Sequence, residues 1–131
     1  MAYTLHFDEM HKVLLVRFSG VLTPKDFETL REDTRKFAAR HGNCDGIIDF
    51  TGLTRSDVDV PYIRSLGRRP RIMGGARRIL VAPQAEMFGL SRVYGLHQDS
   101  VKSDEPMVVR TLEEALALLE LAAPHFVPLE V

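Results

Sequence analysis

Two segments at the start of the chain have the pattern of β-strands. Residues 3–8 alternate loosely between apolar and polar side chains, and a polar stretch separates them from the long apolar run 12–22. A period of two is typical of strands, and a short polar break between two such runs is typical of a hairpin. The pattern therefore predicts two antiparallel strands joined by a turn.

A helix is predicted directly after the second strand. Thr23 can accept an amide hydrogen bond at the N-cap, Pro24 suits the first helical position, and Asp26 suits the positive end of the helix dipole. The apolar residues that follow recur at helical spacing: Phe27, Leu30, Phe37 and Ala38. Gly42 is the expected stop, because glycine is favoured just past a helix end.

The rest of the chain alternates short apolar runs with helical patterns. Strands are predicted at residues 44–50, 76–82 and 107–110, and helices at 61–69, 85–97 and 111–123. Strands that alternate with helices pair in parallel through right-handed crossovers. We therefore expect an α/β fold with a mixed, mostly parallel sheet of about five strands and about four helices, in the order β-β-α-β-α-β-α-β-α.

This pattern predicts one domain, residues 1–123, followed by an apolar tail, residues 124–131. The tail is apolar enough that we expect it to pack on the domain or on a neighbouring copy. The predicted helix 85–97 has more apolar surface than one buried stripe requires. The excess could face a partner subunit in a homodimer, face a small apolar pocket, or form part of a wide core-facing surface.

Composition narrows the class of protein. The 131 residues are 45% apolar and 27% charged with a net charge of −1, as in ordinary globular domains, and no nucleic-acid motif is present. Cys44 is the only cysteine, which excludes an intrachain disulfide framework and a cysteine-based zinc site. No apolar run approaches the ~20 residues that span a bilayer. We expect a cytoplasmic protein that does not bind nucleic acid.

The polar stretch 49–60, DFTGLTRSDVDV, follows a predicted buried strand. Ligands of open α/β sheets bind beyond the carboxyl ends of strands, and paired carboxylates can hold Mg²⁺ or act as acid and base. The alternative is a purely local role, in which Asp49 and Thr51 bond to loop amides and Ser56 or Asp57 caps the following turn.

Arginines are concentrated in one segment, residues 64–78. They are Arg64, Arg68, Arg69, Arg71, Arg77 and Arg78. Guanidinium groups bind phosphate, carboxylate or an anionic lipid head through forked hydrogen bonds. The alternative is a solvated helix end, where cations are favoured by the helix dipole.

No complete catalytic motif is present. Ser91 lies within a predicted helix and lacks the final glycine of a nucleophile elbow. The five histidines have neither of the short spacings typical of metal ligands. Cys44 is expected to be a small buried hydrophobe. The sequence therefore predicts no catalytic residue, no metal site and no cofactor.

The predicted element order, together with the motifs FSGVLTPKDFETL, GIIDFTGLT and ARRILVA, resembles the STAS domain family. The similarity covers about residues 3–122, and it is to the small standalone SpoIIAA-like proteins, which resemble anti-sigma-factor antagonists. It implies the mixed α/β fold described above and a regulatory role through binding of a protein partner.

The resemblance also implies how the stretch 49–60 differs from phosphorylated members of that family. Their loop has the form D-L-S-G-V-x-x-x-D-S-S-G, and the first serine of the pair receives the phosphate. Residues 49–53 match D-L-S-G-V and Asp57 matches the second aspartate, so Val58 lies where that serine would be. Valine has no hydroxyl, and Asp59 replaces the second serine. The family's serine switch is therefore not expected here.

The sequence thus predicts a non-enzymatic binding or regulatory module. The expected binding residues are Thr51, Thr54, Ser56, Asp57, Val58, Asp59, Arg64, Arg68 and Arg69. The partner is expected to be a protein or a small anionic, lipid-like ligand. One alternative is a carrier with an apolar pocket near Tyr62, Met87, Phe88 and Tyr94 and an anionic head held by arginines. A third interpretation is an enzyme that uses the loop carboxylates.

Overall fold

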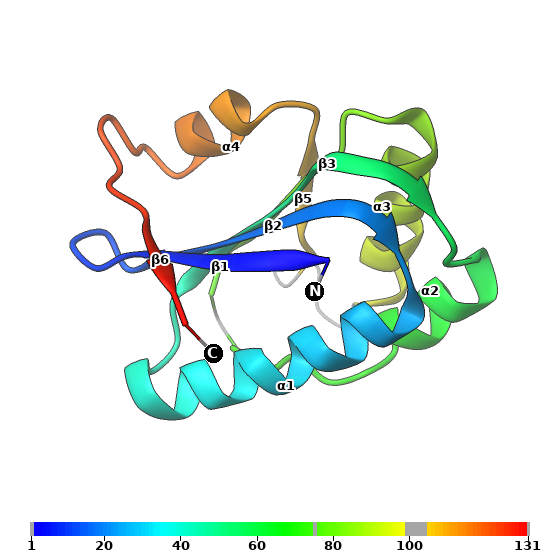
Figure 1. Ribbon diagram of the computed structural model, residues 1–131, viewed down its shortest axis with the longest axis horizontal. Helices are drawn as coiled ribbons and strands as arrows, with labels where there is room; N and C mark the ends of the chain where they lie inside the picture. The colour runs from blue at the N-terminus through cyan, green and yellow to red at the C-terminus, as the bar shows by residue number, and fades with distance from the viewer. Residues whose placement is uncertain (1, 75, 99–104, 131) are drawn as a thin grey trace.

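The computed structural model describes residues 2–74, 76–98 and 105–130 (Figure 1). The strands are β1 (Tyr3–Asp8), β2 (Val13–Leu22), β3 (Asp45–Ser56), β4 (Arg78–Val81), β5 (Met107–Val109) and β6 (Val127–Leu129). The helices are α1 (Pro24–His41), α2 (Val60–Gly67), α3 (Ala85–His97) and α4 (Leu112–Leu118). The predicted order of strands and helices is confirmed.

All six strands form one sheet in the order β5-β4-β3-β2-β1-β6. Strands β2 to β5 pair in parallel, whereas β1 is antiparallel to both of its neighbours. The predicted mixed, mostly parallel sheet is therefore confirmed. The sequence predicted about five strands, and the sixth, β6, comes from the tail, where Val127 and Leu129 pair with Phe7 and Leu5. A three-residue strand that contains a proline is too short to show as periodicity.

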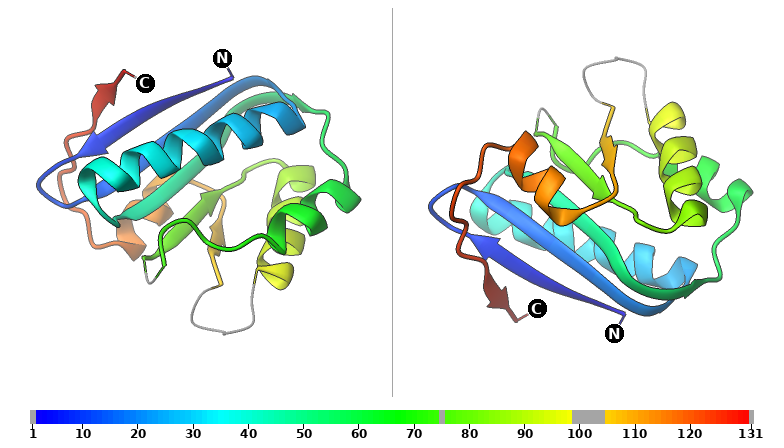
Figure 2. Two further views of the ribbon diagram at one scale, coloured as in Figure 1. Left: turned by 90° about the horizontal axis from the view of Figure 1, so that it is seen from below. Right: turned by 90° about the horizontal axis from the view of Figure 1, so that it is seen from above.

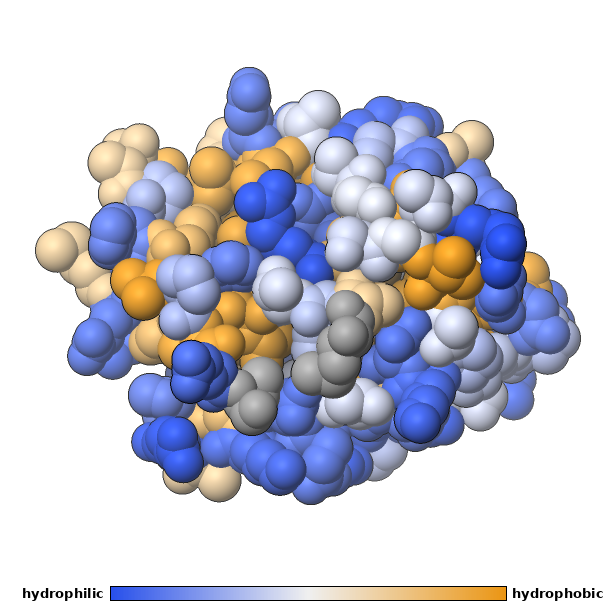
Figure 3. All heavy atoms as spheres, in the orientation of Figure 1, coloured by the Kyte–Doolittle hydropathy of each residue, from blue (hydrophilic) through white to orange (hydrophobic). Residues whose placement is uncertain are grey.

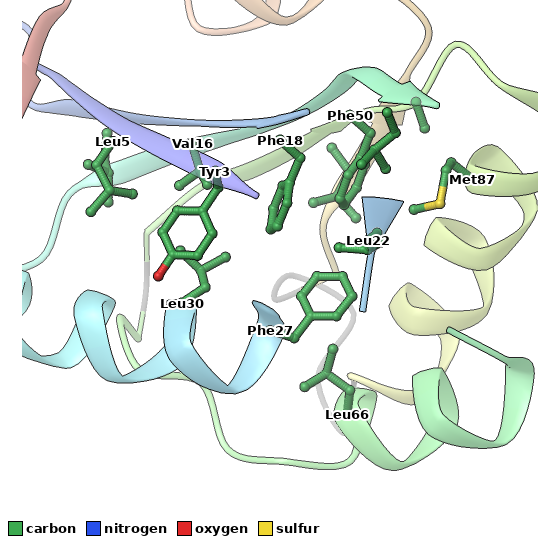
Figure 4. Close-up of a cluster of buried hydrophobic side chains, with 14 of the residues drawn as sticks. Tyr3, Leu5, Val16, Phe18, Leu22, Phe27, Leu30, Phe50, Leu66 and Met87 are labelled. Carbon is green, nitrogen blue, oxygen red and sulfur yellow. The ribbon is translucent and has the colours of Figure 1, made fainter. Parts of the chain in front are cut away.

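The helices cover the two faces of the sheet unequally (Figure 2). Helices α1, α2 and α3 lie on one face and enclose the larger core, while α4 covers part of the other face with Ala115 and Leu119. The large core is built around aromatic rings (Figure 4). The ring of Phe18 lies 5.3 Å from that of Phe50 and 5.7 Å from that of Phe27, distances typical of stabilising aromatic pairs.

Helix α1 lies along the lower edge of the molecule, where Figure 3 shows mainly polar side chains. It begins and ends as predicted. The Thr23 amide donates to Asp26 at 2.8 Å, and the Gly42 amide donates to the Ala38 carbonyl at 2.8 Å. Both ends of the helix are thus closed by hydrogen bonds that its own sequence supplies.

Other boundaries differ from the predictions. Helix α4 ends at Leu118 rather than before Pro124, because Glu120 adopts a left-handed conformation with φ 57°. Strands β4 and β5 are shorter than the apolar runs that predicted them.

A buried carboxylate joins the first hairpin to the tail. Asp8 is 1% exposed and accepts hydrogen bonds from the His11 amide, the His11 imidazole Nδ1 and the His125 amide, each at 2.9 Å. The first two close the β1–β2 turn, and the third anchors the segment that leads into β6. One side chain therefore links parts of the chain that are 117 residues apart.

Candidate functional site

The end of β3 and the start of α2 form a polar surface, which we call the β3–α2 surface: residues 51–60 with Arg64 and Arg68. The sequence predicted a loop from Thr51 onward, which is wrong for residues 51–56. Strand β3 continues to Ser56 because its second half pairs with the end of β2, where Ser19 faces Gly52 and Leu22 faces Ser56. Thr51 and Thr54 are thus exposed residues of a strand, each at a point where its register with β2 shifts.

Gly52 allows the two strands to approach closely. The register shifts between Arg17 and Ser19 and again between Gly20 and Val21, and at each shift β3 has one residue more than β2, which marks bulges in β3. A Cβ atom on Gly52 would lie 2.7 Å from the Phe18 carbonyl oxygen and 3.4 Å from the Ser19 Cα. The glycine is required here by lack of space rather than by a special backbone angle.

Val58 and Asp59 have structural roles at the start of α2. The Val58 side chain is 6% exposed and belongs to the large core, and its amide donates to Ser56 Oγ at 3.3 Å. Asp59 is the N-cap of α2 and accepts from the Tyr62 amide at 2.9 Å. The cap is therefore Asp59, and not Ser56 or Asp57 as the sequence suggested. The Val58 side chain therefore anchors the segment between β3 and α2 to the core.

The carboxylates of this region are engaged separately. Asp49 is 3% exposed, accepts from the Thr51 amide at 2.9 Å, and lies 3.6 Å from Arg17 Nε. Asp57 is exposed and accepts from Arg55 Nε at 3.0 Å and from a second Arg55 nitrogen at 3.3 Å. The contacts of Asp49 with Thr51 and of Asp57 with Arg55 are local, as in the structural alternative for this loop, whereas the contact with Arg17 joins β3 to β2.

The arginine segment divides into two groups. Arg64 is exposed on α2 and Arg68 is exposed at its C-cap, and both belong to the β3–α2 surface. The others turn toward neighbouring groups: Arg69 toward Glu28, Arg71 toward the Ala76 carbonyl, Arg77 toward Asp45, and Arg78 toward Tyr94 and Gln98. Of the predicted binding arginines, only the first group presents its charge freely to a partner on this surface.

Glu28 was not predicted from the sequence, yet it connects α1 to α2. It accepts from Arg69 at 2.6 Å and from the Tyr62 hydroxyl at 2.5 Å. These two hydrogen bonds lower the pKa of Glu28, whereas burial and then the nearby carboxylate raise that of Tyr62 to about 12. Glu28 is one of several charged residues on the outer side of α1, and nothing in the pattern distinguishes it from the rest.

A pocket of about 170 Å³ lies between α1, α2, α3 and the sheet, and we call it the α1–α3 pocket. Its walls are mainly apolar, with Leu30 from α1, Leu66 from α2, and Met87 and Leu90 from α3. Tyr94 also lines it, so two of the four residues expected at an apolar pocket are found there; Tyr62 and Phe88 are not among the lining residues.

Other chemically reactive side chains lie apart from one another. Cys44 is 8% exposed, and burial raises the pKa of its thiol to about 11, as expected for a small buried hydrophobe. Within the described residues, no three His, Cys, Asp or Glu side chains are grouped closely enough to hold a metal ion. In the same part of the chain, no helix is both long and apolar enough to cross a membrane.

Comparison with known proteins identifies the fold. No protein-family model and no curated protein sequence matches the chain. Among solved structures, the chain is similar to the anti-sigma factor antagonist SpoIIAA in its unphosphorylated form, with a TM-score of 0.62 and 17% sequence identity. The similarity covers 93% of this chain and 100% of SpoIIAA. The chain therefore has the STAS, SpoIIAA-like fold that its sequence motifs predicted.

Proposed function

We propose that this SpoIIAA-like fold serves as a regulatory module that binds a protein partner through the β3–α2 surface, without a phosphorylation switch at position 58. The observation that carries the proposal is the way Val58 is held. It lies in the core at the position that matches the phosphorylated serine of relatives, while polar side chains on both sides of it face solvent.

The rigidity of the β3–α2 surface supports a binding role. Thr51 and Thr54 lie on β3, which pairs with β2 on either side of each of them, and Arg64 lies on a helix capped by Asp59. A surface held in one conformation loses little entropy on binding, which favours recognition. Its charges are mixed, with Asp57 and Asp59 before α2, Arg64 within it and Arg68 at its C-cap, and they favour a partner of complementary charge pattern.

The class of partner is suggested by the similar structure. SpoIIAA is an anti-sigma factor antagonist, and the structure similar to this chain is its unphosphorylated form. We propose that this chain binds a protein of the anti-sigma-factor class and is held permanently in the equivalent of that form. Regulation would then come from the amounts of the two proteins rather than from a phosphate.

The first experiment measures binding. Purified candidate anti-sigma factors from the same organism are titrated with the chain in a calorimeter. Replacing exposed residues of the β3–α2 surface, Thr54→Arg together with Arg68→Glu, is expected to weaken binding at least tenfold by steric and like-charge conflict. The matched control, Glu113→Lys, changes an exposed charge on α4, on the opposite face of the sheet. Equal losses in both variants, or none in the first, would contradict the proposed surface.

The second experiment tests the absence of a switch. After incubation of the chain with ATP and a serine kinase that phosphorylates SpoIIAA-like proteins, mass spectrometry is expected to find no phosphate within residues 51–60. The reason is chemical, since Val58 offers no hydroxyl and is buried. A phosphate on Thr51, Thr54 or Ser56 would show that the loop is switched at another position, and would overturn this part of the proposal.

A further inference from the structure

We propose that the α1–α3 pocket binds a small monocarboxylate, whose apolar body fills the pocket and whose charged head lies beside Ser91 and the arginines of the wall. The pocket is lined by the buried faces of α1, α2 and α3, the segment after α2 and the sheet, and none of the exposed residues of the β3–α2 surface lines it. The inference therefore does not depend on the proposed protein partner.

The size and lining of the pocket define the apolar part of the ligand. An engineered apolar cavity of roughly 150 Å³ stays dry and admits benzene. The α1–α3 pocket has about 170 Å³, and its walls include Val16, Phe27, Leu80 and Leu90. It therefore has room for a single ring or a chain of roughly six carbons, and its lining favours apolar groups over water.

One polar group inside the pocket indicates that the ligand carries a polar atom as well as an apolar body. Ser91 is 4% exposed, lines the pocket, and its Oγ has no hydrogen-bond partner among the described residues. A buried hydroxyl without a partner has lost its hydrogen bonds to water with nothing in return, so such groups are rare and need an explanation. A ligand oxygen that accepts from this hydroxyl would remove the cost.

The geometry of α3 places this hydroxyl near a guanidinium group. Ser91, Tyr94 and Gln98 are spaced three and four residues apart, so they follow one face of the helix and its C-terminal cap. Arg78 Nη1 donates to the Tyr94 hydroxyl at 3.0 Å and also bonds to Gln98. A head group bound at Ser91 would thus lie on the helix face that carries Tyr94, the residue whose hydroxyl Arg78 contacts.

The charges around the pocket favour an anionic head. Among the residues that the structure describes, three guanidinium groups line it, those of Arg31, Arg71 and Arg78, against one carboxylate, Asp45. Asp45 already accepts three hydrogen bonds from Arg77, at 2.8, 3.0 and 2.8 Å. Burial, and then repulsion by Arg35 and Arg69, lower the pKa of Arg31, so its cation would gain from a nearby anion. A singly charged carboxylate is favoured over a phosphate, because desolvation costs rise with charge.

The test compares three probes with the same six-carbon chain and different heads: hexanoate, hexanol and hexylamine. Each is titrated into the purified chain while amide signals of α3 and β4 are followed by NMR. We expect saturable binding of hexanoate, and at least tenfold weaker binding of hexylamine, because the arginines repel its cation. Binding of hexylamine as tight as that of hexanoate, equal binding of hexanoate and hexanol, or no saturable binding of hexanoate would each overturn the proposal.

Two variants and a control variant test which side chains contact the ligand. Ser91→Ala is expected to weaken hexanoate binding about fivefold while raising the melting temperature of the unliganded protein, because it removes the buried hydroxyl without a partner. Arg31→Gln, at a half-buried position of the wall, should weaken hexanoate about fivefold and leave hexanol unchanged. Lys36→Gln removes an exposed charge of α1 outside the pocket and should change neither. Unchanged hexanoate binding in both variants would also contradict the assignment.

Discussion

Asp8→Ala is expected to lower the free energy of unfolding by about 3 kcal/mol, because it leaves the amides of His11 and His125 without their acceptor and removes a buried, charge-assisted contact. Urea unfolding followed by circular dichroism measures the loss. Hydrogen exchange of the wild type and the variant should show the largest increase at residues 125–129, since the anchor of that segment is gone. Faster exchange confined to the β1–β2 turn would contradict the role of Asp8 at the tail.

The same carboxylate predicts an acid dependence. Burial alone would raise the pKa of Asp8, but the hydrogen bonds from the His11 amide, the His11 imidazole and the His125 amide outweigh it and lower the pKa from 3.8 to about 2. A carboxylate whose pKa is lower in the folded state stabilises the protein fully above its unfolded pKa and loses that effect as the pH falls through the folded value. Stability should therefore fall between pH 4 and pH 2.

Asp8→Asn is the control for this acid dependence. It keeps an acceptor oxygen of similar size but cannot ionise, so its stability should vary less between pH 4 and pH 2 than that of the wild type. The urea midpoints of unfolding of both proteins, measured between pH 4 and pH 2, test this expectation. Parallel curves for the two proteins would show that other carboxyl groups cause the acid dependence.

Gly52→Ala is expected to destabilise the protein by about 2–3 kcal/mol. The new Cβ atom would lie 2.7 Å from the Phe18 carbonyl oxygen, and both the oxygen and the adjacent Ser19 Cα belong to the backbone of β2. A backbone atom cannot swing away as the end of a side chain can, so the two strands must separate. Equilibrium unfolding in urea gives the size of the effect.

Gly89→Ala is the matched control for this substitution. Gly89 is exposed in the middle of α3, and a Cβ atom there meets no atom within 4 Å. Alanine is the better helix former, so this variant should be more stable by about 0.5–1 kcal/mol. The same chemical change is therefore expected to have opposite signs at the two positions. Two variants of equal stability would mean that the close approach of β3 to β2 does not constrain position 52.

The sequence predicted the fold well wherever the determining interactions lie between residues close together in the chain. Thr23, Pro24 and Gly42 mark the ends of α1 with side chains and backbone preferences that act within one turn, and the structure uses them as expected. The bounds of α3 were also predicted correctly from its apolar spacing. The motifs around residues 49–53 identified the fold family, because they carry both a strand and its close packing on β2.

Features that depend on distant partners could not be predicted. The polar residues 51–56 were predicted to form a loop, yet they belong to a strand because β2 supplies the backbone hydrogen bonds that pair with them. Strand β6 forms because β1 offers an edge and Asp8 holds His125. The pairing of Glu28 with Arg69 and the space left at Ser91 both arise from how helices pack, which no local pattern encodes.

The outermost strands also affect how the molecule meets other chains. A sheet edge recruits an additional strand when it offers a long row of unpaired N–H and C=O groups. Here β5 and β6 have only three residues each, and the middle residue of β6, Pro128, has no amide hydrogen. Proline at an edge is one of the devices by which sheets resist edge-to-edge aggregation. By pairing with β1, the short β6 covers the longer edge of that strand and so lowers the tendency to form amyloid-like or strand-added assemblies.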